Sequence, residues 1–190
     1  MKLRSVLFGC LLAIVAAAPA QASLIYFHTS LNGATETPPV VTTATGSSLV
    51  TFDTVMNTLL VELNWVGLIG GVASAAHIHC CVFPGNNTGV TVPFPAFPSA
   101  VSGTYARTFN LLDPTTYTSG FLAANGGTAA SAEAALIAGI TAGKAYVNIH
   151  NRDNPGGEIR GFLVPEPGML ALLFAGIGGG MAVMRRRRKA

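Results

Sequence analysis

Basic residues are scarce through most of this 190-residue sequence, and their scarcity limits the partners of the protein. Of the 11 Lys and Arg residues, seven lie in the first four and the last six positions. Between Ser23 and Val164, four basic residues stand against seven acidic ones, which gives a net charge of −3 with the histidines neutral. Nucleic-acid-binding domains need a basic patch that follows the phosphate backbone. We therefore expect no nucleic acid among the partners.

The same stretch lacks a recognisable catalytic arrangement. General acid–base catalysis by a pair of carboxylates would need a second carboxyl group with a raised pKa beside Glu158. The sequence indicates none. Asp153 lies in a Gly-rich turn that could offer oxygen ligands to calcium. A calcium site needs several acidic residues, and this turn has one. We therefore expect a protein that is not an enzyme.

The first 22 residues have the three parts of a secretory signal peptide. Lys2 and Arg4 supply positive charge, residues 6–18 form an apolar run, and Ala20–Ala22 is a small-x-small cleavage site. The run is short for a permanent membrane anchor. We expect signal peptidase to cut after Ala22 and the remaining chain to be exported.

Residues 165–190 have the composition of a membrane-anchored tail. Pro165-Glu166-Pro167 is followed by residues 168–184, which carry no charge, and then by Arg185-Arg186-Arg187-Arg188-Lys189. As a helix, the uncharged segment would be about 25 Å long, at the short limit for crossing a membrane. A basic cluster directly after it keeps that end in the cytoplasm. We expect a transmembrane helix over about 168–184.

This tail resembles the PEP-CTERM sorting signal of Gram-negative bacteria, on Pro165, Glu166, Pro167 and the cluster Arg185, Arg186, Arg187 and Arg188. The resemblance implies transient anchoring in the inner membrane and cleavage near residues 165–167 by an exosortase-type protease. The protein would then reach the cell envelope, the outer surface or the extracellular matrix.

Residues 23–164 have the pattern of one β domain. Short β-rich runs alternate with Gly, Pro, Asn and Thr, without an internal repeat or a linker. The pattern predicts strands at Leu24–Leu31, Gly46–Asp53, Thr58–Val66, Ala73–Cys81, Ala100–Leu111, Ala145–His150 and Glu158–Leu163. We expect an all-β fold, an antiparallel β-sandwich or barrel with one short helix.

Three segments of this domain carry more specific predictions. Leu59–Leu63 and Ala145–His150 alternate as strands with one buried and one wet face do. Helical periodicity appears over Ser131–Gly139, with Ser131 as the N-cap and Gly139 as the stop. Val92–Pro98 alternates proline with aromatic residues, so it cannot be a central strand; we expect it to cover the core rather than form an adhesive loop.

Four segments of the domain resemble the CHRD domain, which is named after chordin. They are Leu31–Val40, Ala76-His77-Ile78-His79, Gly143–Asn151 and Asn154–Gly161, in the order found in the family. The resemblance implies an extracellular β domain from a family without a settled catalytic activity. One departure is Cys80-Cys81, where the family usually continues its His-x-His motif with a glycine.

Histidines form the best candidate binding site. His77 and His79 are two residues apart, so both side chains emerge on one face of a strand. This arrangement suits zinc or copper, with His150 or a cysteine thiolate as a third ligand. The alternative is structural: ring nitrogens bonding to Glu158, Arg160 or backbone where the terminal strands meet. We favour the structural interpretation and expect no cofactor, with zinc or copper as the alternative.

Cys80 and Cys81 are the only cysteines left after removal of the signal peptide. Across a trans peptide bond their Cα atoms would be about 3.8 Å apart, which is short for a disulfide. On a strand their side chains would also point to opposite faces. Free thiols, a redox-active bridge between neighbours and pairing with another chain all stay open.

Glu36, Glu158 and Arg160 are the candidate structural charges of the domain. Glu158 and Arg160 share a strand face, so they can pair with each other or separately with neighbours such as Glu36.

Two functions remain. The first is an exported envelope or matrix protein with a non-catalytic binding or structural domain, whose partner is an extracellular polysaccharide or protein. The second is a metal-binding or redox protein that uses the His-x-His strand.

Overall fold

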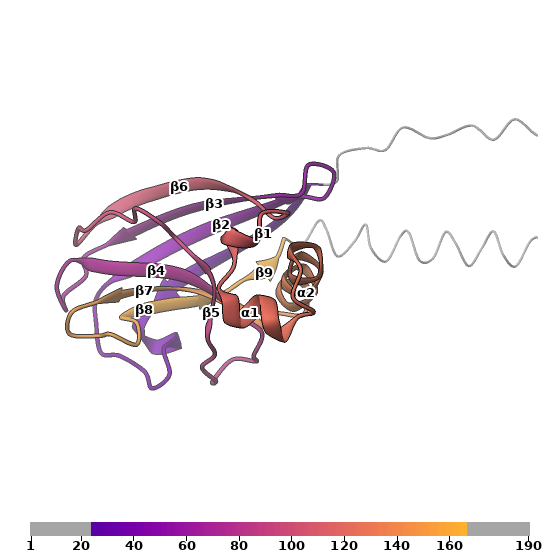
Figure 1. The fold of residues 1–190 in the computed structure, drawn as a ribbon. Coiled ribbons are helices and arrows are strands. Elements are labelled where there is room, and N and C mark those ends of the chain that lie inside the picture. The colour runs from indigo at the N-terminus through magenta and orange to yellow at the C-terminus, as the bar shows by residue number, and fades with distance from the viewer. Residues whose placement is uncertain (1–23, 167–190) are drawn as a thin grey trace, which may run out of the picture.

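The computed structural model describes residues 24–166 as one strongly curved antiparallel sheet with two short helices at one end (Figure 1). The strands are β1 (Leu24–Asn32), β2 (Thr45–Asp53), β3 (Thr58–Val66), β4 (Ala73–Cys80), β5 (Val90–Pro93), β6 (Gly103–Asn110), β7 (Ala145–Asn151), β8 (Ile159–Phe162) and β9 (Val164–Pro165). The helices are α1 (Ser119–Ala124) and α2 (Ala129–Thr141), with 3₁₀ turns η1 (Gly33–Thr35) and η2 (Pro114–Thr116).

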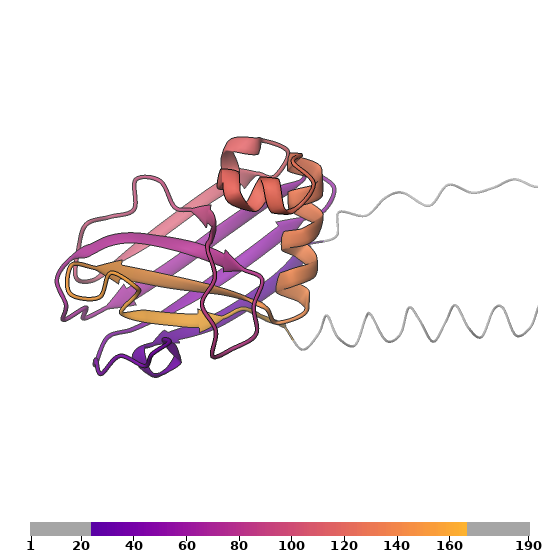
Figure 2. The same ribbon diagram turned by 60° about the horizontal axis from the view of Figure 1, so that its bottom comes forward.

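The sheet folds over on itself into two layers. Its strand order is β5-β4-β7-β8-β1-β2-β3-β6, and β9 pairs with β1. We call β6, β3, β2 and β1 layer A, and β5, β4, β7 and β8 layer B; Figures 1 and 2 show them facing each other with their strands crossing at an angle. Since β5 and β6 do not pair with each other among the described strands, the sheet is an open half-barrel. The all-β expectation is confirmed.

Layer A shows the alternation that the sequence predicts. Leu59, Val61 and Leu63 of β3 are buried in the core, whereas Glu62 and Asn64 between and beside them are exposed. An antiparallel sheet with one face on the core and one in water produces this pattern.

Layer B does not show this alternation of buried and exposed side chains. Ala145, Val147 and Ile149 of β7 face the core, but Tyr146 and Asn148 on the opposite side are each only 1% exposed. The prediction of a wet face for Ala145–His150 is therefore wrong. Two loops, one containing η1 and one joining β4 to β5, lie below β7 and β8 in Figure 1 and contribute residues that bond to this face.

The helix prediction is correct in place and wrong at both ends. Thr128, not Ser131, is the N-cap of α2; Ser131 is the third helical residue, and its side chain completes a capping box with Thr128. Gly139 does not stop the helix, which runs on to Thr141. The second helix, α1, was not predicted, because its six residues are too short to show periodicity.

The proline–aromatic segment closes one end of the core. Its first residues belong to β5, an edge strand that was not predicted and that ends at Pro93, where no ladder donor is needed. Phe94 is buried, and Phe97 stacks on Trp65 with the ring centres 4.6 Å apart. The segment therefore covers the core, as expected.

Both ends of the described domain lie together. Phe27 of β1 pairs with Pro165 of β9, and the backbone N–H of Glu166 donates to the carbonyl of Tyr26 over 3.2 Å. Within residues 24–166, no helix is long and apolar enough to span a bilayer. The predicted signal helix (1–22), the transmembrane helix (168–184), Pro167 and the arginine cluster lie outside the described residues.

Candidate functional site: a buried polar face on layer B

The register of β4, β7 and β8 gathers polar and aromatic side chains on the outer side of layer B. His77 lies opposite Asn148 across β4 and β7, and His79 lies opposite Tyr146. Across β7 and β8, Asn148 lies opposite Arg160. Opposed residues of an antiparallel pair share a face, as do residues two apart along a strand. We call this set the polar face: His77, His79, Tyr146, Asn148, His150 and Arg160.

Arg160 ties two loops to the polar face. The side chain is 1% exposed, and its Nε donates to the carboxylate of Glu36, in the loop after β1. Its Nη2 donates to Asn87 Oδ1 in the β4–β5 loop over 2.8 Å. The guanidinium carbon lies over the Tyr146 ring, 4.4 Å from the ring centre. Of the two pairings considered for Arg160, the structure therefore has the one with Glu36.

Glu36 is held in a position where its charge is poorly solvated. Burial raises the pKa of this carboxyl to about 7, although the Arg160 guanidinium and the Thr37 backbone N–H favour the ionised form. Its Oε1 is buried without a hydrogen-bond partner among the described residues. Gly157, at φ +122°, packs so closely that a Cβ there would overlap Oε1.

Glu158 has a separate, structural position and does not contact Arg160 through its carboxylate. Its side chain is fully buried and accepts hydrogen bonds from the Thr42 hydroxyl, the backbone N–H groups of Ile69 and Gly70, and the Asn151 amide. Burial on its own would raise the pKa of this carboxyl, but the four donors together hold it below its usual range. Glu158 thus fastens the β1–β2 and β3–β4 connections to the end of β7.

The three predicted histidines are brought together. The ring centres of His77 and His79 are 5.6 Å apart, and His77 Nδ1 lies 3.1 Å from His150 Nε2. Each histidine offers one nitrogen such that the three atoms lie within 4.8 Å of one another. The rings also contact two backbone carbonyls, Thr88 for His79 and Pro155 for His150, and His150 Nε2 lies 2.9 Å from Asn148 Oδ1. Within the described residues neither Glu158 nor Arg160 is a hydrogen-bond partner of the rings, so of the structural contacts expected for them the backbone ones are present.

All three imidazoles are neutral near pH 7. Burial lowers the pKa of His77 to about 4, with further lowering by His150 and His79. Burial also lowers the pKa of His79 and of His150, against the hydrogen bonds to Thr88 and Pro155 that favour their protonated forms. Arg160 lowers both further, so the positive charge of the polar face resides on the arginine.

A scan against protein-family models finds the CHRD domain over residues 27–163, almost the whole described domain. The chain belongs to the CHRD family. The resemblance drawn from its four sequence segments is therefore confirmed, and at the level of the family it supports a binding or structural domain. No curated protein and no solved structure matches the chain.

The cysteines of this CHRD domain lie apart from its histidine cluster. Cys80 and Cys81 form a disulfide, with their Cα atoms 3.0 Å apart across a cis peptide bond where a trans bond was expected. The prediction that their side chains point to opposite faces is wrong, because β4 ends at Cys80 and the strand alternation stops there. The sulfur atoms pack against Gly139 of α2, where a Cβ would collide with both. As a bridged pair they are no third ligand for the histidines, and a redox role stays a prediction.

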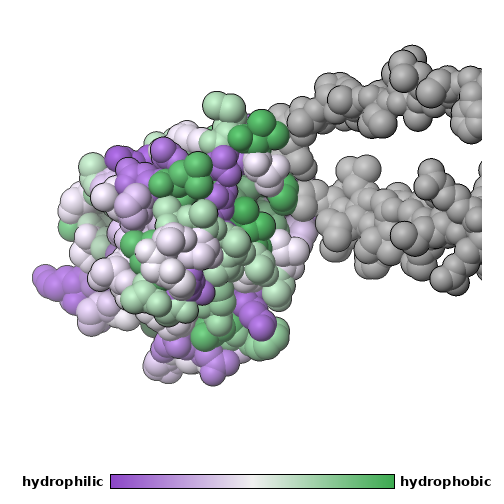
Figure 3. All heavy atoms as spheres, turned by 45° about the vertical axis from the view of Figure 1, so that its right-hand side comes forward, coloured by the Kyte–Doolittle hydropathy of each residue, from purple (hydrophilic) through white to green (hydrophobic). Residues whose placement is uncertain are grey.

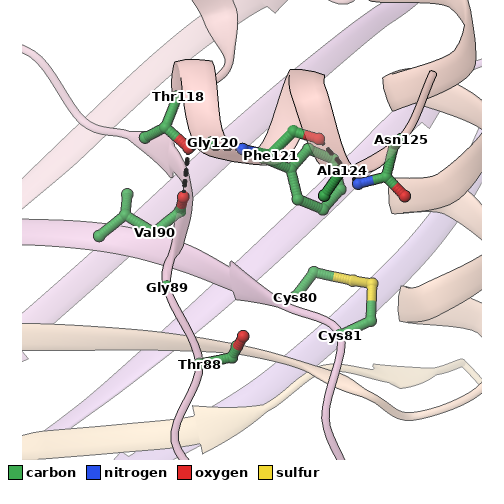
Figure 4. Close-up of a pocket in the computed structure, with 10 residues that line it drawn as sticks. All are labelled: Cys80, Cys81, Thr88, Gly89, Val90, Thr118, Gly120, Phe121, Ala124 and Asn125. Atoms are coloured by element: carbon green, nitrogen blue, oxygen red, sulfur yellow. Dashed lines mark hydrogen bonds between the residues drawn. A yellow bond between two sulfur atoms is a disulfide. The ribbon is translucent and has the colours of Figure 1, made fainter. Parts of the chain in front are cut away.

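The disulfide lines a pocket of about 610 Å³ between the β4–β5 connection and α1. Figure 4 shows the sulfur atoms on one side and Phe121 and Ala124 of α1 on another, with the Thr118 hydroxyl donating to the Val90 carbonyl over 2.6 Å. None of the three histidines lines this pocket, and Cys80 lies on the core side of β4.

The sequence did not point to Asn148, which belongs to the polar face of the CHRD domain, or to Asn87, which bonds to Arg160 of this face. Asn148 lies within one of the family-like segments, and the alternation of Tyr146, Asn148 and His150 along β7 was the available signal. Asn87 had none, since it reaches Arg160 only through the folding of the β4–β5 loop.

Proposed function

We propose that this protein is an exported, non-catalytic CHRD module that an exosortase-type protease delivers to the envelope or extracellular matrix of a Gram-negative bacterium. The observation that carries the proposal is the agreement between the fold and the sorting signals. The CHRD match covers residues 27–163, which lie between the expected cleavage site at Ala22 and the Pro165–Pro167 motif.

The position of β9 supports a specific site of cleavage. Pro165 is paired with Phe27, and the Glu166 N–H is bonded to the Tyr26 carbonyl. Cleavage on the C-terminal side of Glu166 keeps these contacts, whereas cleavage before Val164 removes a strand. We therefore propose a scissile bond on the C-terminal side of Glu166, near the Pro165–Pro167 motif.

A non-catalytic role is supported by the two carboxylates buried beside layer B, Glu36 and Glu158. Glu36 pairs with Arg160, and Glu158 accepts from four donors, so both carboxylates already have structural partners. General acid–base catalysis needs a carboxylate that can reach a substrate.

On the face beside the two chain ends, hydrophobic residues occur in small groups separated by hydrophilic ones (Figure 3).

Sorting is tested by expressing the full chain in an exosortase-carrying Gram-negative host and weighing the protein recovered from each fraction. We expect matrix or envelope protein that starts at Ser23 and ends shortly after Glu166. Replacing Arg185–Arg188 by alanine should leave a heavier form in the inner membrane. The matched control is Arg152→Ala, which removes an exposed arginine of the domain. Matrix protein that retains residues 168–184, or full-length protein in the cytoplasm, would contradict the proposal.

Binding is tested separately with the purified mature protein and isolated extracellular matrix. Retention that is lost after glycosidase treatment identifies a polysaccharide partner, and retention lost after protease treatment of the matrix identifies a protein. A protein that passes through untreated matrix unretained would contradict the binding role and leave the sorting result intact.

A further inference from the structure

One buried nitrogen of the polar face lacks a partner. The His79 ring is fixed by stacking on Tyr146, with ring centres 4.7 Å apart and planes inclined by 3°. Its Nδ1 lies 2.8 Å from the Thr88 carbonyl, so Nδ1 carries the hydrogen. Nε2 therefore holds a lone pair, yet it is buried without a hydrogen-bond partner in the described structure, in a residue that is 94% buried. Such a group needs a donor or a cation.

A second mismatch lies beside it. His150 Nδ1 is 2.9 Å from the Pro155 carbonyl, so in the neutral ring the lone pair is on Nε2. Asn148 donates from Nδ2 to the Gly156 carbonyl, which turns its own acceptor, Oδ1, toward His150 Nε2 at 2.9 Å. Two acceptors this close repel each other unless a proton, such as one donated by His77 Nδ1 from 3.1 Å, or a metal ion lies with them.

The spacing of the cluster is close to that of a metal site. His77 Nδ1 and His150 Nε2 are 3.1 Å apart. Two nitrogens on a tetrahedral zinc ion, at about 2.0–2.1 Å from the metal, are roughly 3.3–3.4 Å from each other. All three donor atoms lie within 4.8 Å of one another, so one ion placed among them is near each of the three nitrogens.

We propose that His77, His79 and His150 bind a zinc or copper ion on the polar face of layer B. A set of three imidazoles suits these metals, whereas Ca²⁺ and Mg²⁺ take oxygen ligands. The site goes beyond the proposed sorting and matrix function and does not depend on it.

The surroundings meet two further requirements of such a site. The Nδ1 atoms of His79 and His150 donate to backbone carbonyls, the outer-shell contact that orients ligating histidines. His77 and His150 are only half-buried, which leaves a way in for the ion. Arg160 is the nearby positive charge, and its pairing with Glu36 offsets the repulsion it would exert on a cation.

One tautomer is required of the ring that has no backbone partner. His77 presents Nδ1 to the ion when its hydrogen is on Nε2.

The test begins with metal analysis of protein purified without chelators, followed by titration of the stripped protein with ZnSO₄ and CuSO₄. We expect one ion per chain for zinc or copper and none for CaCl₂ or MgCl₂. The variants His77→Gln, His79→Gln and His150→Gln should each weaken binding at least 100-fold. The matched control is His28→Gln: His28 is the fourth histidine, exposed on β1 in layer A, and its loss should change the affinity less than twofold.

A measurement on the wild type keeps the test decisive if a variant fails to fold. In ¹⁵N spectra of the histidine side chains, zinc should shift the ring nitrogens of His77, His79 and His150 and leave those of His28 in place. A folded wild type that takes up no stoichiometric metal, or that binds it equally well without His77 and His79, overturns the proposal. So does a spectrum in which only His28 responds.

Discussion

In layer A the outward side chains of β3 and β6, such as Glu62, Asn64 and Thr108, are exposed to water, whereas in layer B the outward Tyr146 and Asn148 are as buried as the core. Both layers pack the same kind of apolar residue on their inner side. Within residues 24–166, two loops cover layer B, held through Glu36, Asn87 and Thr88, whereas these side chains of layer A are left exposed.

A loop can cover a polar strand face only if the hydrogen bonds lost to water are replaced. Layer B does this with ionic and amide groups that meet specific partners, so each of them becomes costly to remove. In layer A outward groups such as Glu62 and Thr108 are exposed to water, so substitutions of these residues change little. Three variants probe this contrast, with the largest expected effect first.

Replacing Arg160 with methionine should destabilise the protein by about 3–5 kcal/mol, because Glu36 would stay buried without its partner. Urea unfolding at pH 7 measures the loss. The control Arg107→Met, on the edge strand β6, removes an exposed arginine that lies opposite Val61 and 5.7 Å from the Phe109 ring centre, and it should cost about 1 kcal/mol or less. Adding Glu36→Leu to Arg160→Met should restore part of the stability. Equal losses for the two single variants would remove the contrast between the layers.

Gly157→Ala should destabilise the protein by about 2–4 kcal/mol, since the residue has φ +122° and its new Cβ would press on Glu36 Oε1 and Asn148 Nδ2. Thermal unfolding of purified protein checks this. Gly156→Ala is the neighbouring control: a Cβ there meets nothing within 4 Å, and we expect a change below about 0.5 kcal/mol. If both alanines were tolerated, the loop would not be held tightly against the face.

The smallest expected effect is a change in how stability depends on pH. Because the pKa of Glu36 is raised from 4.5 to about 7, the folded protein binds more protons than the unfolded chain between these values, and the Glu36 contribution to stability falls as pH rises through them. Glu36→Gln should lack this fall. The charged and titratable groups facing Glu36 are Arg160 and Tyr146.

The measurement is the difference between the free energies of unfolding of the wild type and of Glu36→Gln. It is made at pH 5 and at pH 8 on protein from which metal ions have been removed with a chelator. The wild type should be favoured more at pH 5. Glu62→Gln, the same change on the wet face of layer A, controls for the loss of a carboxylate without burial. A difference that grows toward pH 8 would mean that the Arg160 charge outweighs burial.

Local patterns were enough to predict most of the strands. The alternation in Leu59–Leu63 and the turn residues between runs placed β1, β2, β3, β4 and β7 to within a residue or so at each end. They could not show β5, whose four residues include a proline, or α1, whose helix is less than two turns long. The order of the strands in the sheet could not be predicted either. β8 and β1 are neighbours in space, but they lie at opposite ends of the domain in sequence.

The sequence could predict only those parts of the candidate site that depend on neighbouring residues of a single strand. The spacing of His77 and His79 placed both rings on one face, because it depends on a single strand. Placing His150 beside them required the register of β4 against β7. The burial of the whole face could not be foreseen, since Asn87 and Glu36 come to Arg160 from loops on either side of it.

The Glu36–Arg160 pair joins residues that are 124 positions apart, and β1 finds its last partner in β9. Contacts this distant in sequence form only after the chain between them has been made, and they make folding slow. The domain can therefore close only when Val164 and Pro165 have been made. A chain that ends before them would present an open sheet with unpaired edges, which are open to proteolysis and to pairing with other chains.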